Sequence, residues 1–70
     1  MTAPAVLEML ELAVREGRRV AFRRRGTEYV VVAVGLETGG RRDVLIARLP
    51  MTGEELAFSV HELTDLALIP

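Results

Sequence analysis

The sequence predicts a mainly β fold of the α+β class, with an N-terminal helix followed by a strongly bent, five-stranded barrel. Two observations lead to this prediction. A segment near the N-terminus has apolar residues at helical spacing, and the rest of the chain consists of short apolar runs separated by glycine-containing turns. With 70 residues, we expect a single domain over residues 1–70, with the helix at about 4–16 and the barrel at about 18–69.

The helix is predicted from a row of small and apolar residues at a spacing of three to four. The row consists of Val6, Met9 or Leu10, Ala13 and Gly17. Pro4 is tolerated in a first turn, so Thr2 or Ala3 is expected at the N-cap. Gly17 is expected to end the helix, because glycine readily adopts the left-handed conformation of a C-terminal cap.

The strands are predicted from alternating or dense apolar runs over residues 18–25, 28–36, 43–49, 55–60 and 66–69. Gly26 and Gly53 are expected in tight turns, and residues 38–41 in the turn between the second and third strands. Gly35 is expected to mark a bulge or a sharp bend, which a small barrel needs in order to close. Residues 61–65 are expected to form a single helical turn. This pattern is typical of small barrels of the SH3 or Sm type.

The amount of apolar surface predicts self-association. Half of the residues are hydrophobic, yet a chain of this size buries only roughly 60% of its surface on folding. A small domain with surplus apolar surface commonly buries it by forming oligomers. The candidate interface residues are Leu12, Val14, Val31, Ala33 and Ile69. The alternative is that all of them are buried within one barrel capped by its helix.

Arginine is concentrated near the start of the predicted barrel, where six of the nine arginines lie between Arg15 and Arg25. The chain has no lysine, which fits a GC-rich and thermophilic source. Guanidinium groups bind phosphate, so a basic surface is a candidate site for nucleic acid or a small anion. Its members are Arg18, Arg19, Arg23, Arg24, Arg25, Arg41 and Arg42. The alternative is that these arginines are solvated and paired with nearby acids.

Residue types exclude several kinds of site. With no cysteine and one histidine, the chain offers no zinc site, and we expect no metal and no cofactor. His61 and Ser59 are expected on one side of a strand without an oxyanion donor, so we expect no catalytic residues and no enzyme activity. No apolar run is long enough to span a membrane, and we expect a cytoplasmic protein.

The order of these features resembles a WYL domain over nearly the whole chain from Leu7 onward. The similarity rests on five segments. The first three are residues 13–20 (AVREGRRV), 21–25 (AFRRR) and 34–36 (VGL). In the fourth, Gly39, Gly40 and Arg41 lead into residues 43–48 (DVLIAR), and in the fifth, residues 58–63 (FSVHEL) are followed by Leu66, Ala67 and Leu68. WYL domains are Sm-like barrels, usually carried by bacterial transcription regulators behind a helix-turn-helix domain, and are thought to sense ligands or bind nucleic acid.

The resemblance implies positions for the family's signature residues. Its Trp-Tyr-Leu signature falls on residues 43–45, where only Leu45 agrees, and a frequent tyrosine of the first strand falls near Arg24. The arginine of its Asp-Arg-Ile tail, a ligand-contacting candidate in the family, falls on Glu62. The resemblance therefore implies a barrel that is degenerate at its ligand site. We expect a non-enzymatic, self-associating binding or regulatory module. The alternatives are a nucleic-acid-binding protein that uses residues 18–25, and a small-ligand sensor with a pocket near Leu45, Arg24 and Glu62.

Overall fold

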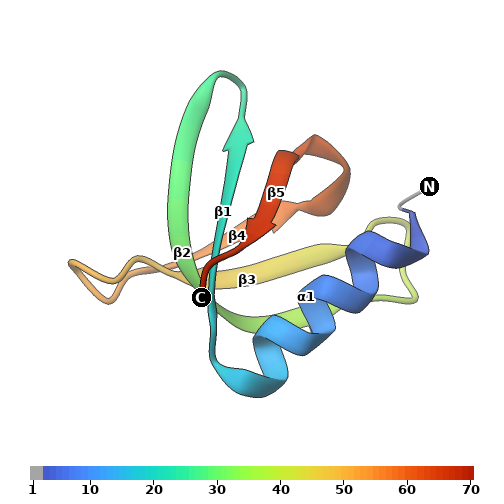
Figure 1. The fold of residues 1–70 in the computed structure, drawn as a ribbon. Coiled ribbons are helices and arrows are strands. Elements are labelled where there is room, and N and C mark those ends of the chain that lie inside the picture. The colour runs from blue at the N-terminus through green and yellow to red at the C-terminus, as the bar shows by residue number, and fades with distance from the viewer. Residues whose placement is uncertain (1–2) are drawn as a thin grey trace.

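The computed structural model describes residues 3–70, in which one helix precedes five strands (Figure 1). The elements are α1 (Pro4–Glu16), β1 (Arg19–Arg24), β2 (Thr27–Glu37), β3 (Val44–Arg48), β4 (Glu55–Ser59), the 3-10 turn η1 (Val60–Glu62) and β5 (Thr64–Leu68). The predicted mainly β class with one N-terminal helix is confirmed. The single helical turn between the last two strands is also present, although it begins and ends earlier than predicted.

Helix α1 begins and ends where its sequence predicts. Ala3 is the N-cap and Pro4 the first helical residue, whereas Thr2 lies outside the described residues. Gly17 has a φ of 63°, in the left-handed region that favours glycine. Its N–H donates to the Val14 carbonyl, and the Arg18 N–H donates to the Ala13 carbonyl at 2.8 Å. These two bonds satisfy carbonyls at the helix end and turn the chain into β1.

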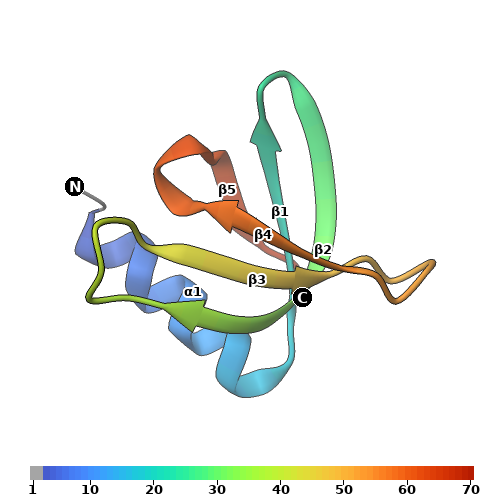
Figure 2. The ribbon, with the colours of Figure 1, turned by 180° about the vertical axis from the view of Figure 1, so that it is seen from behind.

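The strands form one antiparallel sheet in the order β4-β3-β2-β1-β5 (Figure 2). Arg25 and Gly26, at φ values of 51° and 79°, make the two-residue turn between β1 and β2. Positive φ at both positions matches the twist of the strands that such a turn joins. Strands β4 and β5 are the two edges, and no pairing joins them among the described strands. The predicted closure into a barrel is therefore not confirmed.

Strand β2 is long and serves two different neighbours. Its first half, residues 27–32, pairs with β1, and its second half, residues 32–37, pairs with β3. The β3 register shifts between Ala33 and Gly35, as expected for a bulge, which bends a strand. The prediction that Gly35 marks a bulge or bend is confirmed. Strand β3 stops at Arg48 because its register would place Pro50 opposite Val30, and proline has no N–H to donate.

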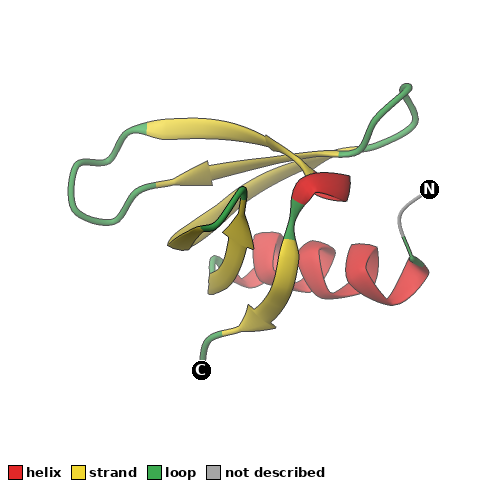
Figure 3. Cartoon of the chain, turned by 90° about the horizontal axis from the view of Figure 1, so that it is seen from above, coloured by secondary structure: helices red, strands yellow, loops and turns green. Residues whose placement is uncertain are grey.

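The buried side chains form a single cluster between the sheet and α1, which lies along one side of the sheet (Figure 3). In β1, Val20 and Phe22 are buried while Arg19 and Arg23 are exposed, as the predicted alternation requires. We call the face that carries the buried residues the inner face and the opposite one the outer face. The cluster consists of Leu10, Ala13, Val20, Phe22, Val31, Ala33, Leu45, Ala47, Phe58 and Val60.

Candidate interaction surfaces

Most arginines of the predicted basic surface are engaged within the chain. Arg23 binds Glu28 across the β1–β2 ladder, with Nη2 2.7 Å from Oε1. That hydrogen bond, followed by the charge of Glu28, raises the pKa of Arg23. Arg18 donates to the Ile69 carbonyl at 3.2 Å and lies 3.7 Å from a Glu16 oxygen. These guanidinium groups therefore already have acceptors.

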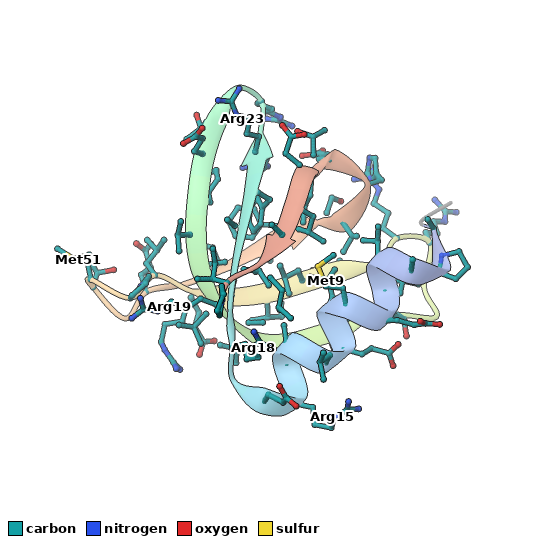
Figure 4. All side chains as sticks on the ribbon, viewed as in Figure 1. Met9, Arg15, Arg18, Arg19, Arg23 and Met51 are labelled. Carbon is teal, nitrogen blue, oxygen red and sulfur yellow. The ribbon has the colours of Figure 1, made fainter. Side chains whose placement is uncertain are left out.

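The arginines also lie on different parts of the molecule. Arg18 and Arg19 lie where β1 begins, and Arg23 lies towards its other end (Figure 4). At about 3.4 Å per residue, Arg19 and Arg23 are about 14 Å apart along the strand. Arg41 and Arg42 belong to the β2–β3 loop, near the start of α1 and away from the β1–β2 turn (Figure 1). The structure thus does not gather the seven predicted arginines into one patch.

Arg24 points to the inner face, where it covers an aromatic cluster. Phe22, Tyr29 and Phe58 are in mutual contact, with ring centroids 5.0–5.6 Å apart. The Arg24 guanidinium carbon lies 5.5 Å from the centre of the Phe58 ring, within the range of a cation–π contact. Since Phe22 and Phe58 are buried, they offer no surface on which nucleic-acid bases could stack.

Glu62 of η1 closes this end of the inner face. Its Oε1 accepts from Arg24 Nε at 3.2 Å, and its Oε2 lies 3.6 Å from Arg25 Nη2. The hydrogen bond from Arg24, more than the neighbouring charges, lowers the pKa of Glu62 despite partial desolvation. The same bond raises the pKa of Arg24.

Of the three residues predicted to surround a ligand pocket, the structure brings two into contact. Arg24 and Glu62 meet, but they bind each other, and Leu45 is fully buried in the core. A surface hollow of about 390 Å³ lies elsewhere, over the β1–β2 ladder. Its lining includes the positive charge of Arg23 and the negative charges of Glu28 and Asp65. A second, of about 260 Å³, lies between α1 and β2 beside Val14 and Leu36.

Sequence reasoning missed Arg48, which lies near Arg19 on the outer face. The β1 register places Arg19 beside Val32, and the β3 register places Arg48 on its other side. Both arginines are exposed and belong to none of the ion pairs between described residues. With strands about 4.8 Å apart, their backbones lie about 10 Å from each other. Alternation could have placed Arg48 on this face, but only the pairing reveals its neighbour.

Two of the strand residues named as interface candidates lie in the core of the chain. Val31 is fully buried and Ala33 is 2% exposed, because the odd-numbered residues of β2 face the core up to the bulge at Gly35. Val14 is half-buried and packs against the core, and Leu12 and Ile69 are half-buried. The apolar outer side of β2 consists instead of Val30, Val32 and Val34, of which Val30 is 49% and Val34 37% exposed.

Other apolar side chains continue this outer face. The pairing places Ile46 of β3 between Gly35 and Ala57, and Ala21 beside both Val30 and Ala67. An outer face open to water usually carries polar residues at these positions. Helix α1 packs on the inner face and leaves this one uncovered.

The open edges of the sheet carry backbone groups that point away from any neighbouring strand. In β4, the Val60 N–H donates to Asp43 and the Glu54 carbonyl accepts from Leu49, so the even-numbered residues face β3. Because backbone groups alternate in an antiparallel ladder, those of Ala57 and Ser59 face outward. In β5, the Ile69 N–H donates to Arg19, which leaves the groups of Leu66 and Leu68 facing outward.

His61 is exposed on η1, close in sequence to Ser59 and Glu62. Within residues 3–70, no three His, Cys, Asp or Glu side chains gather as metal ligands would. The same residues contain no helix with the length and apolar character needed to cross a membrane.

Comparisons of the chain with family models, curated proteins and solved structures find no match.

Proposed function

We propose that this chain is a non-enzymatic, self-associating binding or regulatory module. The open, antiparallel sheet with two unpaired edges, β4 and β5, carries the proposal. Each edge presents outward backbone groups over a strand of five residues, and such edges pair readily with other strands. Pairing of β4 in one copy with β5 in the next satisfies both edges at once. This contact is head-to-tail, and it gives a discrete oligomer when it closes into a ring.

The uncovered outer face supports the same proposal. Val30, Val34 and Ile46 keep apolar surface towards solvent in a chain of only 70 residues. A neighbouring copy that pairs along an edge also covers part of this face. The strand order and the helical turn before the last strand fit the proposed Sm-like, WYL-like module, and we propose a cytoplasmic location for it.

Nucleic-acid binding is a second candidate because Arg19 and Arg48 lie exposed on the outer face on either side of Val32. Phosphate contacts require free guanidinium groups, and these two have no carboxylate partner among the described residues. The candidate is weaker than self-association, because Arg18, Arg23, Arg24 and Arg25 are paired within the chain. A small-ligand sensor at Arg24 and Glu62 would first have to break their ion pair.

Size exclusion with light scattering, with and without a short single-stranded and a double-stranded oligonucleotide, separates these functions. We expect a discrete oligomer whose mass neither oligonucleotide changes. We expect the same result for the double variant Arg19→Ala/Arg48→Ala. A monomer that binds either oligonucleotide, less tightly as salt rises, would reject self-association and favour the arginine pair.

A further inference from the structure

A third unpaired edge lies within the sheet, along the first half of β2. Residues 27–31 pair with β1 on one side only, since pairing with β3 begins at Val32. Figures 1 and 2 both show this half of β2 standing clear at the side of the molecule, with no strand beyond it. Sequence periodicity cannot reveal this edge. The edge arises because β3 stops pairing with β2 before Pro50.

The free backbone groups on this edge belong to Glu28 and Val30. The Ala33 N–H donates to the Arg18 carbonyl at 3.1 Å, so the odd-numbered residues of β2 face β1 and the even-numbered ones face away. Val32 faces β3 and pairs with Arg48. In the described part of the chain, no loop or turn hydrogen bond reaches the backbone of Glu28 or Val30. Their N–H and C=O groups therefore point to solvent.

We infer that this segment pairs with the same segment of a second copy, antiparallel about a two-fold axis at Tyr29; this rests on the proposed self-association. In that register Glu28 lies opposite the partner's Val30, and each such pair exchanges two hydrogen bonds. The free groups of both copies are then all used. A two-fold contact is also the commonest symmetry of protein dimers.

Side chains on both faces suit this pairing. On the inner face, the half-buried Tyr29 meets the partner's Tyr29, which extends the aromatic cluster of Phe22 and Phe58 across the axis. On the outer face, Val30 loses its exposure to water. Glu28 does not repel the copy strongly, because Arg23 already holds its carboxylate at 2.7 Å.

The β2 edge is also more regular than the other two edges. Strand β5 has a shifted register, and Asp65 within it has a φ of 53°, so its edge is irregular. Strand β4 begins with the exposed Glu55, which belongs to none of the ion pairs between described residues, whereas Arg23 binds the Glu28 of the β2 edge. The β2 edge is regular over residues 27–32 and has the exposed Val30 at its centre. It is the edge best suited to pair with its own copy.

Proline at position 30 tests the pairing with little effect on the internal ladder. The Val30 N–H points away from β1, so Val30→Pro removes a donor only from the free edge. Val30→Thr is the matched control, because threonine keeps the N–H and the β-branched shape. We expect Val30→Pro to weaken the dimer by about tenfold or more, since symmetry removes two hydrogen bonds, and Val30→Thr to weaken it far less.

Amide hydrogen exchange of the wild-type protein, read residue by residue over a range of protein concentrations, gives the deciding result without any variant. We expect the amides of Glu28 and Val30 to become protected as concentration rises. Association that protects Ala57, Ser59 or Leu68 but leaves Glu28 and Val30 unprotected would overturn this inference and keep the proposed function. No association at any concentration would reject both. Protection of Val30 that is independent of concentration would show that the chain itself covers the edge, and would also overturn the inference.

Discussion

Arg24 and Glu62 lie 38 positions apart in the sequence, yet Arg24 Nε is 3.2 Å from Glu62 Oε1. This bond ties the end of β1 to η1, between the two edge strands. It also holds the Arg24 guanidinium over the Phe58 ring. The contact thus fastens the turn that separates β4 from β5 to the end of β1.

The first prediction concerns the pH dependence of this contact. The bond to Arg24 lowers the pKa of Glu62 in the folded protein, so the unfolded chain binds a proton on Glu62 more readily than the folded chain does. The stabilisation is therefore present above the ordinary pKa of 4.5, and it is lost as pH falls through the lower folded-state pKa. We expect Glu62→Gln to lower the melting temperature at neutral pH, and the difference from wild type to shrink at acidic pH.

Glu54→Gln is the control for that experiment. Glu54 is exposed and belongs to none of the ion pairs between described residues. Its substitution should leave the melting temperature nearly unchanged at both pH values. Equal effects of the two substitutions would show that the Arg24–Glu62 contact contributes nothing specific.

The second prediction tests which side of β2 faces the core. Val31 is fully buried and Val30 is 49% exposed. Val31→Thr places a hydroxyl in the core at a cost of about 1–3 kcal/mol in the free energy of unfolding, whereas Val30→Thr should change it by less than about 0.5 kcal/mol. Urea denaturation of both variants, at a concentration where each is monomeric, measures the difference. The reverse order would mean that the strand faces the other way.

The third prediction concerns how α1 attaches to the sheet. Leu10 is fully buried, so Leu10→Ala should cost about 2–5 kcal/mol of unfolding free energy. Leu7→Ala makes the same chemical change at a half-buried position and should cost less. Denaturant unfolding of the two variants compares them. Similar losses would contradict the described orientation of the helix.

The fourth prediction concerns the end of α1. Gly17 has a φ of 63°, and the space beside its Cα is open, so Gly17→Ala meets only backbone strain. We expect a loss of about 1–2 kcal/mol. Gly40→Ala is the matched control, since Gly40 is also in open space but has no positive φ. Thermal unfolding of the pair should show a lower melting temperature for Gly17→Ala alone.

The sequence predicts the elements of this fold well because their signals are local. Three features follow from the conformation that nearby residues require. They are the end of the helix at Gly17, the β1–β2 turn at Gly26 and the bulge at Gly35. Barrel closure depends on how far the sheet bends, which no local pattern determines. The uniform apolar run from Val30 to Val34 also hides which side faces the core, so the inward Val31 and Ala33 were placed at an interface.

The candidate surfaces were harder to predict because they depend on partners far apart in the chain. Six neighbouring arginines suggest one basic patch, but alternation sends Arg23 and Arg24 to opposite faces. Glu62, which binds both Arg24 and Arg25, comes from the far end of the sequence. The outer-face pair of Arg19 and Arg48 needs the register of three strands before it can be seen.

Sedimentation velocity of the wild-type protein over a wide range of concentrations tests the central claim, self-association, most directly. The chain has a mass of 7.7 kDa. We predict that the measured mass rises with concentration to a discrete multiple of this value, and that the transition is unchanged by added salt, because backbone pairing and apolar contacts carry it. A mass of 7.7 kDa at every concentration would contradict the proposed self-association.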